Sequence, residues 1–85
     1  MIVELTEDER ELLTMRVRMP ETLRQVVLSA RPVSGKWQLQ LSQDQADEIR
    51  DHCANSLIEI GFDERYQPNK AGQLLERLVD RFFTG

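Results

Sequence analysis

The stretch from Ser42 to Gly61 constrains the fold most, because it carries signals for both ends of a single helix. Ser42 and Gln45 have the spacing of a capping box, in which each side chain satisfies a free backbone N–H group of the first turn. Gly61 stands where a left-handed C-terminal cap is favoured. The sequence therefore predicts a helix over residues 43–60.

This helix has two chemically different faces. An apolar stripe at helical spacing predicts a face that packs against a core, and it consists of Ala46, Ile49, Cys53, Leu57 and Ile60. The opposite face is acidic, and it consists of Asp44, Asp47, Glu48, Asp51 and Glu59. The helix is thus expected to organise the core and to present a strongly charged surface.

The size and composition indicate one small folded domain covering residues 1–85. A chain of 85 residues buries only about 60% of its unfolded surface, so a dimer interface would add useful stability. The single cysteine excludes an internal disulfide and a cysteine-based zinc cluster. No apolar run reaches the roughly 18 residues of a membrane span, and the acidic N-terminus is not typical of a secretory signal. We therefore expect a cytoplasmic protein without a membrane partner.

The N-terminal half is expected to contain two further helices. Residues 2–5 have the pattern of a short strand, and Thr6 and Glu9 form a second capping box before a helix over 6–18. Arg16 interrupts the apolar pattern of that helix, so either its side chain finds a partner or the helix ends early. Pro20 favours a new helix over 20–30, with a strand through Val26–Leu28 as the alternative. Residues 31–35 are predicted to form a loop.

A strand and a final helix complete the predicted fold. Residues 37–41 alternate between apolar and polar side chains, as a half-buried strand does, and their partner is residues 2–5, residues 25–31 or a second subunit. Asn69 is expected to cap a helix over 70–83. The prediction is an α+β domain with three to four helices on a small antiparallel two-stranded sheet. Its expected core is Trp37, Leu39, Leu41, Ile49, Cys53, Leu57, Ile60, Leu74, Leu75, Leu78 and Phe82.

Candidate catalytic and metal-binding residues are few. Glu48 and His52 are four residues apart on one helix, which lets both side chains reach a single ion, with Asp63 and Glu64 as further donors if their loop folds back. Cys53 lies on the buried stripe, where a thiol behaves as a small hydrophobe. We therefore expect no enzyme and no cofactor, and we keep a small metal- or ligand-binding subunit built on Glu48 and His52 as the alternative.

The charges are segregated along the chain. Residues 16–36 carry five bases and one acid, whereas residues 37–64 carry seven acids and one base. A nucleic-acid site would use the basic segment, but the net charge of −4 opposes phosphate binding and makes this the weaker interpretation. Its candidate residues are Arg16, Arg18, Arg24, Arg31 and Lys36.

Two surfaces suit contacts with another protein. The first is the acidic helix face, with Asp44, Asp47, Glu48 and Asp51 as candidate contacts for a basic partner. The second is an apolar shoulder on the last helix, which is either covered by the N-terminal helix or used for self-association; it consists of Val79, Phe82 and Phe83. The functional hypothesis is a non-enzymatic interaction domain, of an accessory, regulatory or inhibitor type, that docks a basic partner or forms a homodimer.

Overall fold

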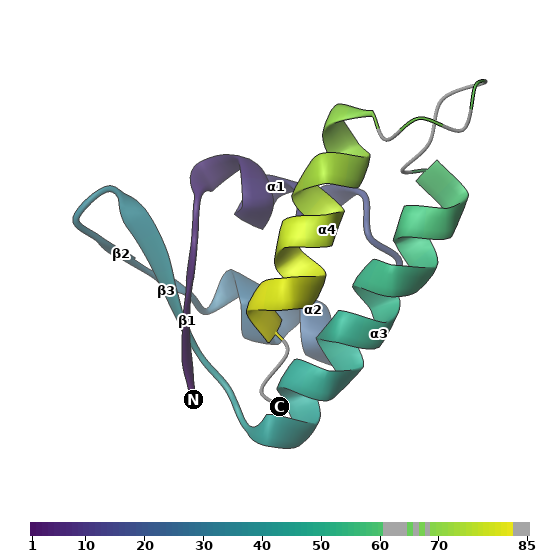
Figure 1. The fold of residues 1–85 in the computed structure, drawn as a ribbon. Coiled ribbons are helices and arrows are strands. Elements are labelled where there is room, and N and C mark those ends of the chain that lie inside the picture. The colour runs from purple at the N-terminus through teal and green to yellow at the C-terminus, as the bar shows by residue number, and fades with distance from the viewer. Residues whose placement is uncertain (61–64, 66, 68, 83–85) are drawn as a thin grey trace.

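A computed structural model describes residues 1–60, 65, 67 and 69–82, and Figure 1 shows the arrangement of its elements. The fold is α+β, as predicted, and the described residues form four helices and a three-stranded antiparallel sheet. In chain order the elements are β1 (Ile2–Leu5), α1 (Glu7–Met15), α2 (Glu21–Leu28), β2 (Arg31–Val33), β3 (Lys36–Gln40), α3 (Gln43–Ile60) and α4 (Lys70–Phe82).

The sheet has one strand more than the sequence predicted. Its order is β1-β3-β2, and both neighbours of β3 run antiparallel to it. The third strand, β2, occupies residues that were expected to form a loop, because Pro32 and the short length of the strand hide its pattern. Ser34 and Gly35 connect β2 to β3 with φ angles of 51° and 81°, which is the left-handed geometry of a tight two-residue hairpin.

The helices lie on one side of the sheet and leave its other face open (Figure 1). Along β1 the exposed residues Ile2 and Glu4 alternate with the buried residues Val3 and Leu5. Such alternation is typical of an antiparallel sheet with one face on the core and one face in solvent. The core therefore lies between the sheet and the helical layer.

Both edges of the sheet are protected from pairing with another strand. At the β1 edge, Arg81 from α4 donates a hydrogen bond of 3.1 Å to the backbone carbonyl of Glu4. At the β2 edge, the hairpin register places Pro32, which has no N–H group, between the two residue pairs that bond to β3, so its backbone faces outward. Addition of a strand from another chain is therefore disfavoured at either edge.

The predicted helix caps are present. Thr6 and Glu9 exchange hydrogen bonds of 3.2 Å and 2.8 Å at the start of α1. Ser42 and Gln45 do the same at 2.9 Å and 3.1 Å at the start of α3, which spans the residues predicted for it. The expected C-terminal cap at Gly61 lies outside the described residues. These local signals determine where the two helices begin.

Asn69 caps α4, as predicted, and also ties this helix to α3. Its side-chain oxygen accepts a hydrogen bond of 2.8 Å from the N–H group of Gly72, and its amide nitrogen donates one of 2.9 Å to the carbonyl of Ile60. One side chain therefore satisfies a backbone N–H group at the start of α4 and a backbone carbonyl group at the end of α3. The two helices pack closely along their length (Figure 1).

The first helix is shorter than predicted, and the second segment is a helix. Arg16, with φ of −121°, ends α1 after Met15, so the helix does not continue to residue 18. Of the two explanations for the interrupted apolar pattern, early termination is correct. The segment after Pro20 forms α2, so the alternative strand through Val26–Leu28 is excluded.

The core is larger than predicted on its N-terminal side. Leu39, Leu41, Ile49, Cys53, Leu75, Leu78 and Phe82 are buried as expected, and Trp37, Leu57, Ile60 and Leu74 are partly buried against them. The predicted core omitted the buried residues of β1, α1, α2 and the segments that follow the two helices; these are Val3, Leu5, Leu12, Leu13, Val17, Leu23, Val27 and Ala30.

Trp37 is half-buried at the rim of the sheet, where polar side chains contact its ring. Its Nε1 donates a hydrogen bond of 2.6 Å to Glu7, and the guanidinium of Arg10 lies 4.0 Å from the ring centroid. Arg10 over the indole face is a cation–π contact, which stabilises a ring at the surface by about 0.5–1 kcal/mol. This cluster joins α1 to β3 at the rim of the sheet.

Candidate docking surface

The outward face of α3 is acidic, as the sequence indicated. Asp44, Glu48 and Asp51 are exposed, and none of them forms an ion pair with the described residues. Asp47 is half-buried and engaged within the helix, since it lies 3.8 Å from Arg50 and accepts a hydrogen bond of 3.2 Å from Gln43. Three of the four predicted acidic contacts therefore stand free on the surface.

The same face carries an exposed apolar side chain that the sequence analysis missed. Ile58 is 77% exposed and follows Asp51 by seven residues, so the two side chains lie on the same side of the helix two turns apart. The sequence did contain a signal for it, because Ile58 lies outside the apolar stripe that was predicted to face the core. The outward face of α3 thus combines free carboxylates with an uncovered aliphatic group. We call this surface, consisting of Asp44, Glu48, Asp51 and Ile58, the acidic face.

The apolar shoulder of α4 is not a comparable surface. Phe82 is fully buried in the core, as its place in the predicted core requires, so it is not exposed as the surface contact that was the alternative. Val79 is partly buried and packs against the same core. Phe83 lies outside the described residues. The shoulder was expected to be either core or contact surface, and for Phe82 it is core. The inward side of α4 packs against the rest of the core.

A second exposed apolar group lies at a groove between α1 and α4. Met15 is 75% exposed at the end of α1. It lines a groove of about 230 Å³ together with Leu12, Ala71 and Leu74, and with the charged residues Asp8, Glu11, Arg16 and Lys70. This groove is an apolar surface that the sequence did not reveal, because its two sides come from opposite ends of the chain.

Of the two main residues proposed for a metal site, only His52 lies at a hollow of the described surface. His52 lines a hollow of about 390 Å³ with Arg18, Asn55, Ser56 and Glu59, whereas Glu48 does not line it. Among the described residues no three His, Cys, Asp or Glu side chains come together as metal ligands would. Asp63 and Glu64, the further candidate donors, lie outside the described residues. His52 therefore shares its hollow with a cation as well as with a carboxylate.

Cys53 is buried in the core between α3 and its neighbours. Burial in this apolar environment raises the pKa of the Cys53 thiol to about 12, since the thiolate is poorly solvated there. A thiol that stays protonated at neutral pH is a weak nucleophile. The position of Cys53 is that of a core residue.

The candidate nucleic-acid residues do not form one surface. Arg16 lies at the α1/α4 groove, and Arg18 lies at the hollow beside His52. Arg31 lines a third hollow on the open face of the sheet with Gln38 and Gln40. The remaining candidates also come from different elements: Arg24 is half-buried on α2, and Lys36 lies 3.9 Å from Glu4 on the sheet. Phosphate binding needs adjacent cations. Among these residues Arg31 and Lys36 share the open face of the hairpin, whereas Arg16 and Arg18 line different hollows.

Comparison of this chain with protein-family models, with curated proteins and with solved structures finds no match. None of the helices in the described part of the chain is long and apolar enough to span a bilayer. The acidic face of α3 combines exposed carboxylates with one strongly exposed aliphatic side chain.

Proposed function

We propose that this chain is a non-enzymatic interaction domain that docks a protein partner on the acidic face of α3. The observation that carries the proposal is the 77% exposure of Ile58 beside unpaired carboxylates on one helix face. Protein interfaces have an apolar centre within a polar rim, and Ile58 with the carboxylates of the same helix face offers both parts of that arrangement. The partner is a protein segment that is basic and offers an apolar side chain.

The two parts of the acidic face contribute differently to binding. Burial of Ile58 contributes about 1.5–3 kcal/mol, the usual value for one large aliphatic side chain. Asp44, Glu48 and Asp51 attract a basic partner over longer distances and favour one orientation, and their effect decreases with added salt. Affinity should therefore depend mainly on Ile58, and the rate of association mainly on the carboxylates.

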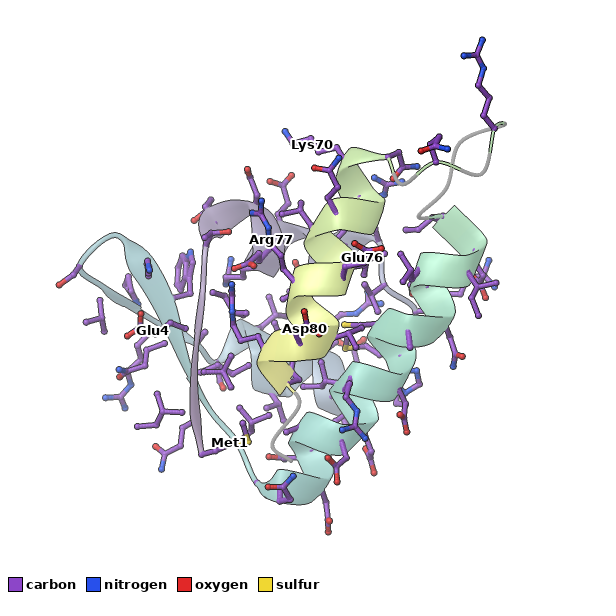
Figure 2. The ribbon with its side chains drawn as sticks, in the orientation of Figure 1. Met1, Glu4, Lys70, Glu76, Arg77 and Asp80 are labelled. Atoms are coloured by element: carbon purple, nitrogen blue, oxygen red, sulfur yellow. The ribbon has the colours of Figure 1, made fainter. Side chains whose placement is uncertain are left out.

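The test is capture of a partner by the immobilised chain, compared across variants. The first variant is Ile58→Gln, and the second combines Asp44→Asn with Asp51→Asn. The control combines Glu76→Gln with Asp80→Gln on α4, where Figure 2 shows both side chains. The exposed side of α4 also carries Arg77 and has no strongly exposed apolar residue. The control therefore removes the same number of charges from a surface that we do not propose to bind.

The proposal predicts that a protein, either foreign or a second copy of the chain, is recovered from native extracts by the wild type and by the α4 control. Both α3 variants should lose most of it. Recovery of no protein and no second copy would contradict the proposal. Recovery that is equal for all four chains would also contradict it, because binding would then not use α3.

A small-ligand site is the second candidate, favoured by the hollow that contains His52. Arg18 and Glu59 at the same hollow give it charges of both signs, which suits a polar ligand with two charged ends more than a bare metal ion. The melting temperature measured with zinc, with manganese and with a set of amino acids tests this candidate. A rise that is lost in His52→Gln would support it, and no rise with any of these ligands would oppose it.

A further inference from the structure

The sheet narrows from three strands to two beside Gln40, the last residue of β3. β2 begins at Arg31, which pairs with Gln38, so β3 extends beyond the start of this neighbour. On its other side β3 stays paired to its end, because Gln40 lies opposite Ile2 of β1. The end of β3 therefore has a neighbouring strand on one side only.

The backbone N–H and carbonyl groups of Gln40 point to the side that lacks a strand. Met1 and Leu41 exchange backbone hydrogen bonds of 2.8 Å and 3.1 Å, so they form a hydrogen-bonded pair at the end of the β1–β3 ladder. In an antiparallel ladder such pairs alternate with pairs that exchange no hydrogen bond. The next pair, Ile2 with Gln40, is therefore of the second kind, and its backbone groups face away from each other. The edge of β3 thus offers one donor and one acceptor at Gln40.

The residue that would continue β2 opposite Gln40 belongs to the end of a helix instead. Counting back from the pair of Arg31 and Gln38 places Ser29 opposite Gln40. Ser29 is the C-cap of α2, with φ of −77° and ψ of −2°, and its N–H group bonds to the carbonyl of Gln25 at 3.0 Å. No backbone hydrogen bond between described residues engages Gln40 on this side. Both groups of Gln40 are therefore available to another molecule.

A hollow of about 440 Å³ opens at this place, and it is lined by Ile2, Ser29, Arg31, Gln38 and Gln40. Its volume lies within the range of about 300–1,000 Å³ that is usual for small-molecule sites. Arg31 is exposed and forms no ion pair with the described residues. Ile2 is 60% exposed and adds an aliphatic side chain. The hollow therefore combines one cation, one backbone donor and acceptor, and one apolar group.

We propose that this hollow binds an N-acylated amino acid, the chemical unit that also forms the end of a peptide chain. The ligand lies beside Gln40 in the orientation of β2, so its amide N–H group donates to the Gln40 carbonyl and one carboxylate oxygen accepts from the Gln40 N–H group. A chain in this orientation runs toward Arg31, which places the carboxylate on the side of that residue. Carboxylate and guanidinium form strong, charge-assisted hydrogen bonds.

The residues around the hollow favour an acylated amino group over a free one. None of the residues that line it is an acid, so a charged amino group has no partner there. A neutral amide N–H group needs only the one carbonyl of Gln40. The side chain of the ligand lies on the open face of the sheet, as those of Gln40 and Ile2 do, and Ile2 favours an apolar one. This site is separate from the acidic face and does not depend on the proposed docking.

The test is a titration of the ¹⁵N-labelled chain with N-acetyl-leucine, followed through the amide chemical shifts. Two related ligands separate the contacts: N-acetyl-leucinamide lacks the charged carboxylate, and leucine has a charged amino group in place of the amide. The variant Arg31→Gln removes the cation of the hollow. The matched control Arg16→Gln removes an arginine that is likewise exposed but lies at the α1/α4 groove. Circular dichroism verifies that both variants are folded.

N-acetyl-leucine should cause saturable shifts at Gln38 and Gln40, with the Gln40 amide moving most because its N–H group gains a hydrogen bond. Arg31→Gln should weaken binding about 10- to 100-fold, the effect of losing a hydrogen bond between charged groups, and the leucinamide should bind more weakly by a similar factor. Leucine should also bind more weakly, and Arg16→Gln should bind as the wild type does.

A tetrapeptide that ends in leucine distinguishes two sources of the ligand. Binding at least as tight as that of N-acetyl-leucine indicates the end of a protein chain, and weaker binding indicates a free small molecule.

Three results would overturn the proposal. N-acetyl-leucine could cause no saturable shift at Gln40. It could bind no more tightly than N-acetyl-leucinamide, which would show that the carboxylate is not recognised. Arg31→Gln could bind it as tightly as the wild type does, which would exclude the guanidinium from the site. None of these results bears on docking at α3, which uses a different surface.

Discussion

Arg81 in the last turn of α4 pairs with the carboxylate of Glu9 in the first turn of α1, and so joins residues 72 positions apart in the chain. Glu9 is 1% exposed, and its Oε1 also accepts a hydrogen bond of 2.8 Å from the N–H group of Thr6. Arg81 donates as well to the carbonyl of Glu4, at 3.1 Å. One ion pair therefore connects a helix cap, a strand edge and the C-terminal helix.

Loss of the arginine should destabilise the protein more than loss of the charge on its partner. Arg81→Met leaves the buried carboxylate of Glu9 unpaired and should lower the free energy of unfolding by about 3 kcal/mol, the lower end of the range because Arg81 is partly exposed. Glu9→Gln should cost less, since glutamine keeps the capping box. Urea unfolding of both variants and of the double variant checks this, and additive losses would contradict the pairing.

Asn69 should matter more for stability than Ser42 does. Ser42→Ala removes a capping bond and should cost about 1 kcal/mol. Asn69→Ala removes a capping bond to Gly72 and also the bond to the carbonyl of Ile60, so its cost should be larger. Thermal unfolding of the two variants measures the difference. Equal melting temperatures would show that the link between α3 and α4 contributes nothing.

The hairpin between β2 and β3 contains a residue that a single substitution should improve. Ser34 has a φ of 51°, a conformation that costs about 1 kcal/mol for most L-residues and less for asparagine. Ser34→Asn creates an Asn-Gly pair, the preferred sequence for such a turn, and should raise stability by up to about 1 kcal/mol. Ser34→Val should lower it. Denaturant midpoints of both variants test the turn, and the opposite order would contradict it.

Cys53 should make the protein less stable at high pH. Burial raises the pKa of its thiol to about 12, whereas the thiol of an unfolded chain titrates near pH 8.5–9. Between these pH values the unfolded chain loses a proton that the folded chain retains, so the stabilising contribution is complete below about pH 8.5 and decreases above it. The decrease approaches about 1.4 kcal/mol per pH unit.

Unfolding free energies of the wild type and Cys53→Ala from pH 7 to pH 11 isolate this effect. The variant is expected to be less stable at neutral pH because it leaves a small cavity. The difference in unfolding free energy between the wild type and Cys53→Ala should become smaller as the pH rises. A gap that stays constant would show that the thiol ionises as easily in the folded chain as in the unfolded chain.

The sequence predicted those parts of the fold that depend on neighbouring residues. Both capping boxes and the helix over residues 43–60 are determined within a few residues of chain, so local patterns were sufficient. The strand at Arg31–Val33 was missed because its pairing with β3 provides its only clear support. The Glu9–Arg81 pair was missed because nothing in local spacing relates residues so far apart.

The candidate site shows the same division. The acidic residues of α3 were visible as a helical pattern, and the structure leaves three of the four free. Phe82 was expected either in the core or on a contact surface, and the sequence could not decide between them because its burial depends on how α4 lies against the rest of the fold. The groove at Met15 could not be predicted from spacing, since α1 and α4 form it together.

The most direct test of docking on α3 is a map of amide chemical shifts in ¹⁵N-labelled chain, recorded as the protein captured by the immobilised chain is added. We predict concentration-dependent shifts on the acidic face, from Asp44 to Ile58. Amides on the outward side of α4 and on the open face of the sheet should not move. Shifts confined to the outward side of α4 or to the open sheet face, or no shifts at any concentration, would contradict docking on α3.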